Sequence, residues 1–347
     1  MICKYKSEDE ESSFADFNYD SLPIIPIDIK DSVYSKILFK YFRVITLKDR
    51  KRIHHSLKEN NVDILHFHYG SDAGIFSPIL KQINIPSIVS FYGYDAHSFP
   101  KRFFGIGARY LRKRVFKYIS KVLVMSEEMK NDLLNIGCPE EKITIHYHGV
   151  PKTLSSISAR SYSHKTIRLL IVSYFDPVKG HIFVLESLKK LLKNGISNFE
   201  FNIIGDGFYK KEIESKIKEL GIQEYVTIHG PVKYNSPEYR KVFSEADIFV
   251  HPSVTTRNDK EGIPGAVVEA MFAGLPVIST YHGGIPYIIQ NEKNGYLFSI
   301  GNSKELAEKI NLALNKDHTL MQKNAKKSVE KFSWNKVIQK LERLFQP

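Results

Sequence analysis

The chain has 347 residues, of which 42% are hydrophobic, and its 50 Lys and Arg against 38 Asp and Glu give a formal net charge of +12. This length predicts two domains, and the positive charge favours an acidic partner: nucleic acid, anionic lipid or a phosphorylated substrate. The sequence has no run of about 18 apolar residues, its N-terminal stretch MICKYKSEDEESS lacks the apolar core of a secretory signal, and its two cysteines exclude a disulfide framework, so a cytoplasmic protein is expected.

Short apolar runs separated by helical patterns organise the first half of the chain. We expect strands buried on both faces at residues 62–68, 85–91, 121–126 and 142–147. His66 and His68 come at the end of the first run and share one face of it, as a metal-binding pair would. Because no third ligand follows at a recognisable spacing, a structural role is the favoured interpretation.

The basic segment, residues 101–121, contains eight Lys and Arg and no Asp or Glu. Its apolar side chains, among them Phe103, Phe104 and Ile106, complement the charges. This combination predicts a helix that docks on an anionic membrane surface. A packed helix with a solvated basic face is the alternative. Nucleic acid is not expected as a partner, because the sequence contains no recognisable nucleic-acid-binding motif.

The alternation of apolar runs and helical patterns restarts after a Ser-rich linker at residues 153–165. Five further runs follow: IRLLIVS, FEFNIIG, YVTIHG, DIFVHPS and LPVIST. Repeated strand-helix units predict an α/β protein with two doubly wound parallel sheets and an active site in a cleft between them. We expect an N-terminal domain over 1–155, a C-terminal domain over 156–330, and a final helix at 331–347 that packs back on the N-terminal domain.

Two loops after predicted strands suit a phosphate group. VSYFDPVKG supplies Lys179 just before a helix whose first amides can bind phosphate oxygens, although an isolated Lys-Gly pair is more often a surface lysine beside a helix cap. IIGDGFYKK places Gly205 and Gly207 in a turn that a ligand can approach closely, and an ordinary strand-to-helix turn is the alternative.

Two glutamates, Glu261 and Glu269, flank the start of another predicted helix. Pro264 suits the first helical position, so the helix is expected to begin there and to run through Met271. Its free amides favour an anionic group, and carboxylates beside that anion are better suited to accept hydrogen bonds from sugar and ribose hydroxyls. Ordinary helix-start and exposed-helix acids are the alternative.

The run EGIPGAVVEAMFAGLPVISTYHGGIP resembles the E-x7-E region of retaining glycosyltransferases of family 4, and it is especially similar to colanic-acid-type exopolysaccharide enzymes. VKG, IIGDG, ADIFVHPSV and SEEMKNDLLNIGCPEEKI extend the match. The resemblance implies the GT-B fold, with two Rossmann-like domains facing a cleft. It also implies catalytic roles for Glu261 at the donor sugar and Lys179 at the diphosphate, with Glu269 on the ribose. The further donor-binding residues that it implies are Gly205, Gly207, Gly262, Ile263, Pro264 and Gly265.

The chain departs from the family pattern at several positions. Tyr174 stands where a cationic residue usually helps to neutralise the diphosphate. In the acceptor-side loop Tyr92 replaces a histidine and Asp95 is retained, and His68 lies where that loop begins, so these three are the acceptor-side candidates. The opening MICKYKSEDE resembles the family's second strand region. The first strand and the Gly-rich loop are therefore expected to be missing, through an upstream start codon or a truncated gene.

The resemblance implies transfer of a sugar, with retention, from a nucleotide sugar to a glycan or lipid-linked acceptor in cell-surface polysaccharide biosynthesis. The departing phosphate would deprotonate the acceptor hydroxyl. No D-x-D motif occurs, so neither a metal ion nor another cofactor is expected. The basic segment would hold the protein at the inner face of the cytoplasmic membrane. A non-catalytic GT-B subunit of a polysaccharide assembly and a sugar-nucleotide epimerase are the alternatives.

Overall fold

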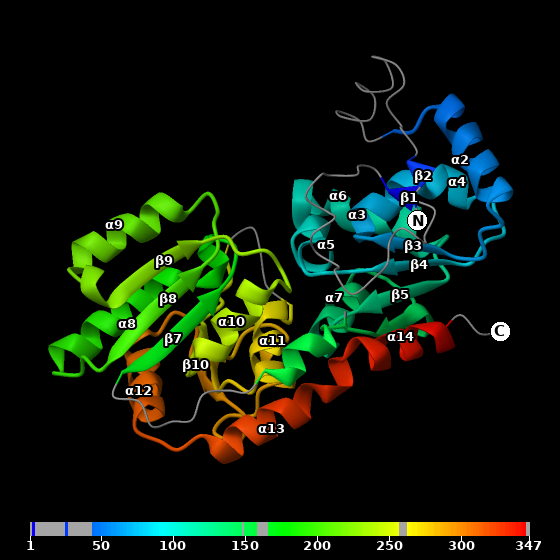
Figure 1. The fold of residues 1–347 in the computed structure, drawn as a ribbon. Coiled ribbons are helices and arrows are strands. Elements are labelled where there is room, and N and C mark those ends of the chain that lie inside the picture. Colours follow the sequence, from blue (N-terminus) through cyan, green and yellow to red (C-terminus); the bar gives the residue numbers. More distant parts are fainter. Residues whose placement is uncertain are drawn as a thin grey trace. The chain divides into compact units, whose positions relative to one another are not determined.

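The computed structural model describes residues 2–3, 25–26, 44–147, 149–157, 166–256 and 262–344. Packing divides the chain into unit 1, Met1–His146, and unit 2, Tyr147–Pro347 (Figure 1). Each unit contains its own parallel sheet with helices, which confirms the predicted fold class. Within the described ranges, no helix is both long and apolar enough to cross a membrane.

Unit 1 is built on a four-stranded parallel sheet. Its strands, in spatial order, are β3 (Leu65–His68), β4 (Ser87–Ser90), β5 (Lys121–Val124) and β6 (Ile143–Ile145). All four predicted runs therefore form strands. The prediction that all are buried on both faces was wrong for β3 and β6, which lie at the sheet edges and are partly exposed. A separate parallel pair joins β1 (Ile2–Cys3) to β2 (Ile25–Pro26).

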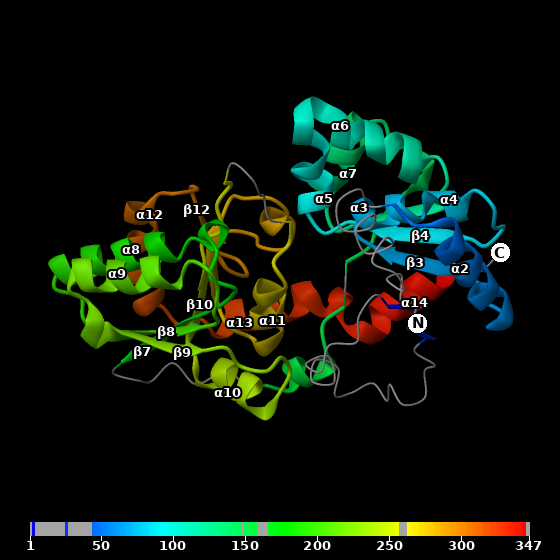
Figure 2. The ribbon, with the colours of Figure 1, turned by 90° about the horizontal axis from the view of Figure 1, so that it is seen from above.

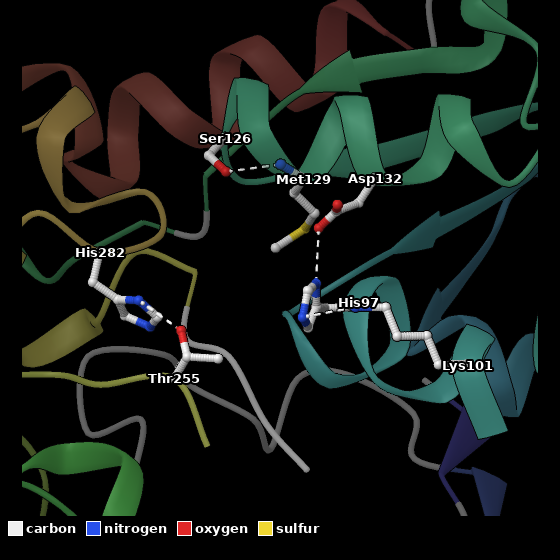
Figure 3. A network of polar contacts seen from close by, with 7 residues as sticks. All are labelled: His97, Lys101, Ser126, Met129, Asp132, Thr255 and His282. Atoms are coloured by element: carbon white, nitrogen blue, oxygen red, sulfur yellow. Dashed lines mark hydrogen bonds and ion pairs between the residues drawn. The ribbon is translucent and has the colours of Figure 1, made fainter. Parts of the chain in front are cut away.

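One helix precedes the four strands, and shorter helices connect them. They are α2 (Leu47–Glu59), α3 (Gly70–Ala73), α4 (Ser77–Leu80), α5 (Tyr94–His97), α6 (Arg102–Leu111) and α7 (Glu127–Asn135). The basic segment is only partly α-helical, because a π-helix at Arg112–Phe116 follows α6 and its last residue, Lys121, begins β5. Ser126 caps α7 by accepting a hydrogen bond from the amide of Met129 (3.2 Å, Figure 3).

Unit 2 contains a six-stranded parallel sheet. In spatial order its strands are β12 (Tyr296–Phe298), β11 (Val277–Thr280), β10 (Ile248–His251), β7 (Ile167–Val172), β8 (Phe199–Ile204) and β9 (Val226–Gly230). All five predicted runs are confirmed, whereas the short β12 was not predicted. The first strand of the unit, β7, lies beside the fourth, β10, so the strand order reverses between them, as in dinucleotide-binding folds.

Helices cover both faces of this sheet. They are α8 (His181–Lys193), α9 (Lys210–Leu220), α10 (Pro237–Glu245), α11 (Gly265–Ala273), α12 (Ser303–Leu314) and α13 (Thr319–Val329). A further helix, α14 (Trp334–Arg343), follows α13 in the chain. Helix α8 contacts α9 and α12, while α11 contacts α10 and α13, and Figure 2 places these groups on opposite faces. This arrangement is the doubly wound architecture that the sequence predicts.

Helix α11 is the most deeply buried of the segments that carry predicted site residues. Every residue from Val267 to Ala273 is buried, and Gly274 ends the helix in the left-handed conformation (φ 81°). The helix begins at Gly265 with Pro264 as its N-cap, and it extends two residues beyond the predicted end at Met271. The difference is small because a proline marks a helix start to within one position.

Candidate active site

The candidate donor site of unit 2 lies where its strands end. All six strands are parallel, so the loops that follow them meet at one edge of the sheet. The strand order reverses between β7 and β10, and folds of this kind bind ligands at the carboxyl edge beside such a reversal. Lys179 ends the 3-10 turn Pro177–Lys179 after β7, and Gly205 and Gly207 follow β8.

At Gly180 the loop after β7 packs against the loop after β10. Its backbone is left-handed (φ 73°), and a Cβ atom there would lie 2.0 Å from the carbonyl oxygen of Pro252. Nearby, the amide of Val254 donates to the carbonyl of Val178 (2.8 Å). Only glycine allows this approach, so the position of Lys179 depends on the residue that follows it.

Gly205 and Gly207 pack against the loop after β7. A Cβ atom on Gly205 would lie 1.9 Å from the carbonyl oxygen of Ser173, and one on Gly207 would lie 2.5 Å from that of Phe175. The amide of Phe175 also donates to the carbonyl of Asp206 (2.9 Å). Close packing of two backbone segments thus accounts for both glycines, and their contact with a donor remains a prediction.

The residues before α11 meet the loop after β11. The amide of Gly284 donates to the carbonyl of Gly262 (3.0 Å), and the hydroxyl of Tyr147 donates to the carbonyl of Ile263 (3.4 Å). Thr255, after β10, contacts Nδ1 of His282, after β11 (3.3 Å, Figure 3). The N-terminus of α11 is therefore fixed at the same edge of the sheet as Lys179, where its positive end favours an anion.

Glu269 is buried one turn into α11, with 6% of its surface exposed. The hydroxyl of Tyr239, from α10, donates to its Oε2, and Tyr234 is a second hydrogen-bond partner. Burial raises the pKa of Glu269, while the two tyrosines lower it. A carboxylate has about four acceptor sites, so these donors leave capacity for a ligand hydroxyl. Glu261 lies outside the described residues.

Three polar residues at this edge were not predicted as site residues. Tyr234 and Tyr239 carry no local signal, because their partner is some 30 positions away in the sequence. His181 directly follows the Lys179-Gly180 pair, and its Nε2 lies 3.0 Å from Oγ of Ser173. Burial, together with the nearby charges of His251 and Lys179, lowers the pKa of His181 to about 3, so its ring is neutral at pH 7. Its place at the start of α8 could have revealed it.

The three acceptor-side candidates come together in unit 1. Nδ1 of His68, at the end of β3, hydrogen-bonds the hydroxyl of Tyr92, after β4. The carboxylate of Asp95 is fully buried and accepts hydrogen bonds from the amides of Gly70 (2.7 Å) and Tyr92 (2.9 Å). Asp95 therefore ties together the loops that follow two neighbouring strands.

Burial governs the protonation of these groups. It raises the pKa of Asp95 to about 6, although backbone donors led by the Gly70 amide lower it. Burial raises the pKa of Tyr92 to about 12 and lowers that of His68. At neutral pH the cluster thus presents a neutral imidazole and a neutral phenol.

His66 belongs to the same aromatic group. Its ring stacks on that of His68 at 4.7 Å, and its Nε2 lies 2.8 Å from Oγ of Ser90. Burial, with His68 and His146 nearby, lowers its pKa to about 4. In the part of the chain that the structure describes, no group of three His, Cys, Asp or Glu could hold a metal ion.

A second polar contact in unit 1 links His97 to Asp132 (3.3 Å, Figure 3).

Comparison with solved structures agrees with this architecture. The chain is similar to a glycosyltransferase from Rickettsia africae (TM-score 0.78, 21% identity, 99% of this chain and 88% of the other). It is also similar to HepE of Anabaena in complex with UDP-glucose (TM-score 0.74, 17% identity, 95% and 89%). Two parallel α/β units with a loop-lined edge define the class of GT-B glycosyltransferases, and the chain has this fold.

Family models identify the chain within this class. The model of Glycosyl transferases group 1 matches residues 157–331, and that of Glycosyltransferase Family 4 matches residues 10–154. The chain belongs to the glycosyl transferases group 1 family. It is 30% identical over 256 residues to the amylovoran biosynthesis glycosyltransferase AmsK of Erwinia amylovora, covering 71% of this chain. It is 30% identical over 199 residues to the putative colanic acid biosynthesis glycosyltransferase WcaL of Escherichia coli, covering 57% of this chain. The chain spans 60% and 48% of the length of these two relatives.

Proposed function

We propose that the protein transfers a sugar, with retention of configuration, from a nucleotide sugar to a glycan or lipid-linked acceptor in exopolysaccharide biosynthesis. The observation that carries this proposal is that Lys179 and the N-terminus of α11 follow β7 and β10, the two neighbouring strands between which the strand order of unit 2 reverses. The names of AmsK and WcaL support the pathway, and the complex of HepE with UDP-glucose supports the donor class.

The residues at the sheet edge would stabilise the departing diphosphate. Lys179 supplies a positive charge, and the first amides of α8 and α11 supply preorganised donors. Glu269 would accept a hydrogen bond from the ribose, and Glu261 would position the donor sugar. The leaving phosphate would take the proton of the acceptor hydroxyl, so no protein nucleophile and no metal ion is required.

The cluster of His68, Tyr92 and Asp95 would orient the acceptor. Tyr92 can donate or accept a hydrogen bond, but with a pKa of about 12 it does not act as a base at neutral pH. Asp95 would hold Tyr92 in place by accepting hydrogen bonds from the backbone amides of Tyr92 and Gly70. The cluster therefore positions a hydroxyl and leaves its proton to the phosphate.

The deciding experiment supplies radiolabelled nucleotide sugars together with a membrane lipid extract. Label in the organic phase, with the donor's anomeric configuration and undiminished by a chelator, is the expected result. Interconversion of the nucleotide sugar without an acceptor would identify an epimerase instead. Donor binding without turnover would identify a non-catalytic subunit.

The carboxylate of Glu269 gives a matched test of the donor site. Glu269→Gln should weaken binding of a nucleoside diphosphate about tenfold, since a hydrogen bond to a charged group contributes roughly 1.5 to 3 kcal/mol. Glu224→Gln removes a charge in the same unit from an exposed side chain outside the site and should leave binding unchanged. Equal affinities for both variants, measured calorimetrically, would contradict the assigned role.

The basic segment supports a peripheral membrane location. Phe104 is fully exposed and Ile106 is 62% exposed, and exposed cations lie on either side of them in the chain, at Arg102 and Arg109. An apolar pair flanked by cations suits insertion between anionic headgroups at the inner face of the cytoplasmic membrane.

A further inference from the structure

A cavity of about 480 Å³ lies within unit 1. Its walls come from three places in the sequence: the start of α2, the turn and helix around α4, and the π-helix that follows α6. Buried Ile45 and Ile75, with Pro78, form its apolar part. Its volume lies in the range of about 300 to 1,000 Å³ that is typical of small-molecule sites.

Among the described residues that line the cavity, five carry a positive charge and none carries a negative one. They are Arg50, Lys81, Lys113, Arg114 and Lys117. Arg50 and Lys81 lie outside the basic segment, so the fold itself brings the cations together. Like charges that line one cavity repel one another, and a bound anion would reduce this repulsion.

No carboxylate within the described ranges forms an ion pair with any of the five. Nε of Arg50 donates to the carbonyl of Ile45 (3.2 Å). Lys81 and Lys117 both lie over the ring of Tyr118, at 5.3 and 5.7 Å from its centre. Aromatic rings thus hold these side chains in place without neutralising their charge.

The backbone on one side of the cavity is also unusual. Lys113 and Arg114 are carried by the π-helix Arg112–Phe116, and π-helical turns are rare and frequently occur at functional sites. Nζ of Lys142 donates to the carbonyls of Phe116 (2.7 Å) and Ile119 (2.9 Å), which fixes the end of this turn. The wall that carries the cations is therefore well supported.

We propose that this cavity binds the phosphate group of an organic phosphate ester. A phosphate carries nearly two negative charges and three acceptor oxygens, which suits convergent Lys and Arg side chains better than a single carboxylate does. The apolar wall would contact the organic part of the ester. This site consists of unit 1 residues alone and goes beyond the donor and acceptor sites proposed above.

Calorimetric titration with inorganic pyrophosphate at low salt tests the charge cluster. The double variant Lys81→Gln/Lys117→Gln should bind at least tenfold more weakly than the wild type. The control Lys101→Gln/Arg109→Gln removes the same charge from exposed positions in or near α6 that do not line the cavity, and it should bind within twofold of the wild type. Equal losses in both variants, or no loss in either, would overturn the proposal. Thermal melting verifies that both variants fold.

Lysine acetylation read by mass spectrometry separates this cavity from the proposed donor site. Pyrophosphate should protect Lys81, Lys113 and Lys117 from acetylation, whether or not it also protects Lys179. Protection of Lys179 alone would overturn the cavity site and leave the donor site intact. Protection of the cavity lysines alone would support the cavity site and count against the donor site.

Vesicles distinguish the two sources of such a phosphate. If the source is a lipid headgroup, vesicles with phosphatidic acid should protect the cavity lysines more than vesicles of equal charge with phosphatidylglycerol. If it is a soluble phosphate ester, pyrophosphate should protect them and the two kinds of vesicle should not differ. Lack of protection by both pyrophosphate and phosphatidic acid would overturn the proposal.

Discussion

At Glu269, a buried carboxylate depends on tyrosine hydroxyls. Tyr239→Phe removes the hydrogen bond to Oε2 and should lower the free energy of unfolding by about 1 to 3 kcal/mol, because the buried carboxylate loses one of its two tyrosine donors. Tyr225→Phe removes the same atom from a ring that packs on Phe199, and its hydroxyl makes no hydrogen bond within the described residues. Urea unfolding should show a larger loss of unfolding free energy for Tyr239→Phe than for Tyr225→Phe. Equal losses would mean that the hydrogen bond from Tyr239 to Glu269 does not stabilise the fold.

The carboxyl group of Asp95 should make unit 1 sensitive to pH. Its pKa in the folded protein, about 6, lies above the ordinary value of about 3.9, so the folded state binds this proton more tightly. The protonated carboxyl group therefore adds up to roughly 3 kcal/mol to the free energy of unfolding. This contribution is fully present below about pH 4 and is lost as the pH rises through about 6.

Asp95→Asn tests this contribution, because an amide does not titrate. Hydrogen exchange of peptides from β3 and β4 should accelerate between pH 4 and 6.5 in the wild type, after correction for intrinsic exchange rates, and more weakly in the variant. Parallel profiles would show that Asp95 does not titrate in this window.

Among the connecting elements, the turn after β8 depends on glycine for close packing. Gly205 has φ 142°, and a Cβ atom would collide with the carbonyl of Ser173 at 1.9 Å, whereas Gly195 has φ 78° and open space around it. Both alanine variants bear backbone strain, but only Gly205→Ala also forces two loops apart. Gly205→Ala should therefore lower the melting temperature more than Gly195→Ala, and equal shifts would show that strain alone matters.

Helix α6 should insert its apolar pair into a membrane. Phe104→Ser/Ile106→Ser should weaken flotation with anionic vesicles at least tenfold, because each apolar side chain contributes about 1.5 to 3 kcal/mol when fully buried. Leu320→Ser removes a comparably exposed side chain, 71% exposed, from α13 and should have no effect. Flotation that is insensitive to all three substitutions would contradict docking through α6.

The elements were predictable where hydrophobic pattern alone decides them. Nine predicted apolar runs form strands. Six of them are central strands, which read as continuous apolar segments in parallel sheets, and three, β3, β6 and β9, are edge strands. The three-residue β12, Tyr296–Phe298, was too short to stand out. Gly205, Gly207 and Lys179 could be singled out as site candidates because they follow predicted strand ends, and their contact with a donor stays a prediction. Tyr239 was not found, because its contact with Glu269 depends on the packing of α10 against α11.

Over the whole molecule, the net charge of +12 should make membrane association depend on salt. Salt shortens the distance over which electrostatic attraction acts, from about 30 Å at 0.01 M to about 8 Å at 0.15 M. Binding to anionic vesicles should fall steeply over this range, while the weaker binding to neutral phosphatidylcholine vesicles should not. Flotation at increasing salt measures both, and a salt-independent result would assign the interaction to apolar contacts.

The order of the strands in unit 2 has a consequence for synthesis of the protein. Leu169 in β7 pairs with Ile248 in β10, roughly 80 residues later in the chain. At about 5 to 20 residues per second, a ribosome needs roughly 4 to 16 s to supply that partner. Until then the emerging chain exposes one unpaired edge of β7. Chaperones that bind extended apolar segments should therefore engage the nascent chain most strongly in the interval before β10 leaves the exit tunnel.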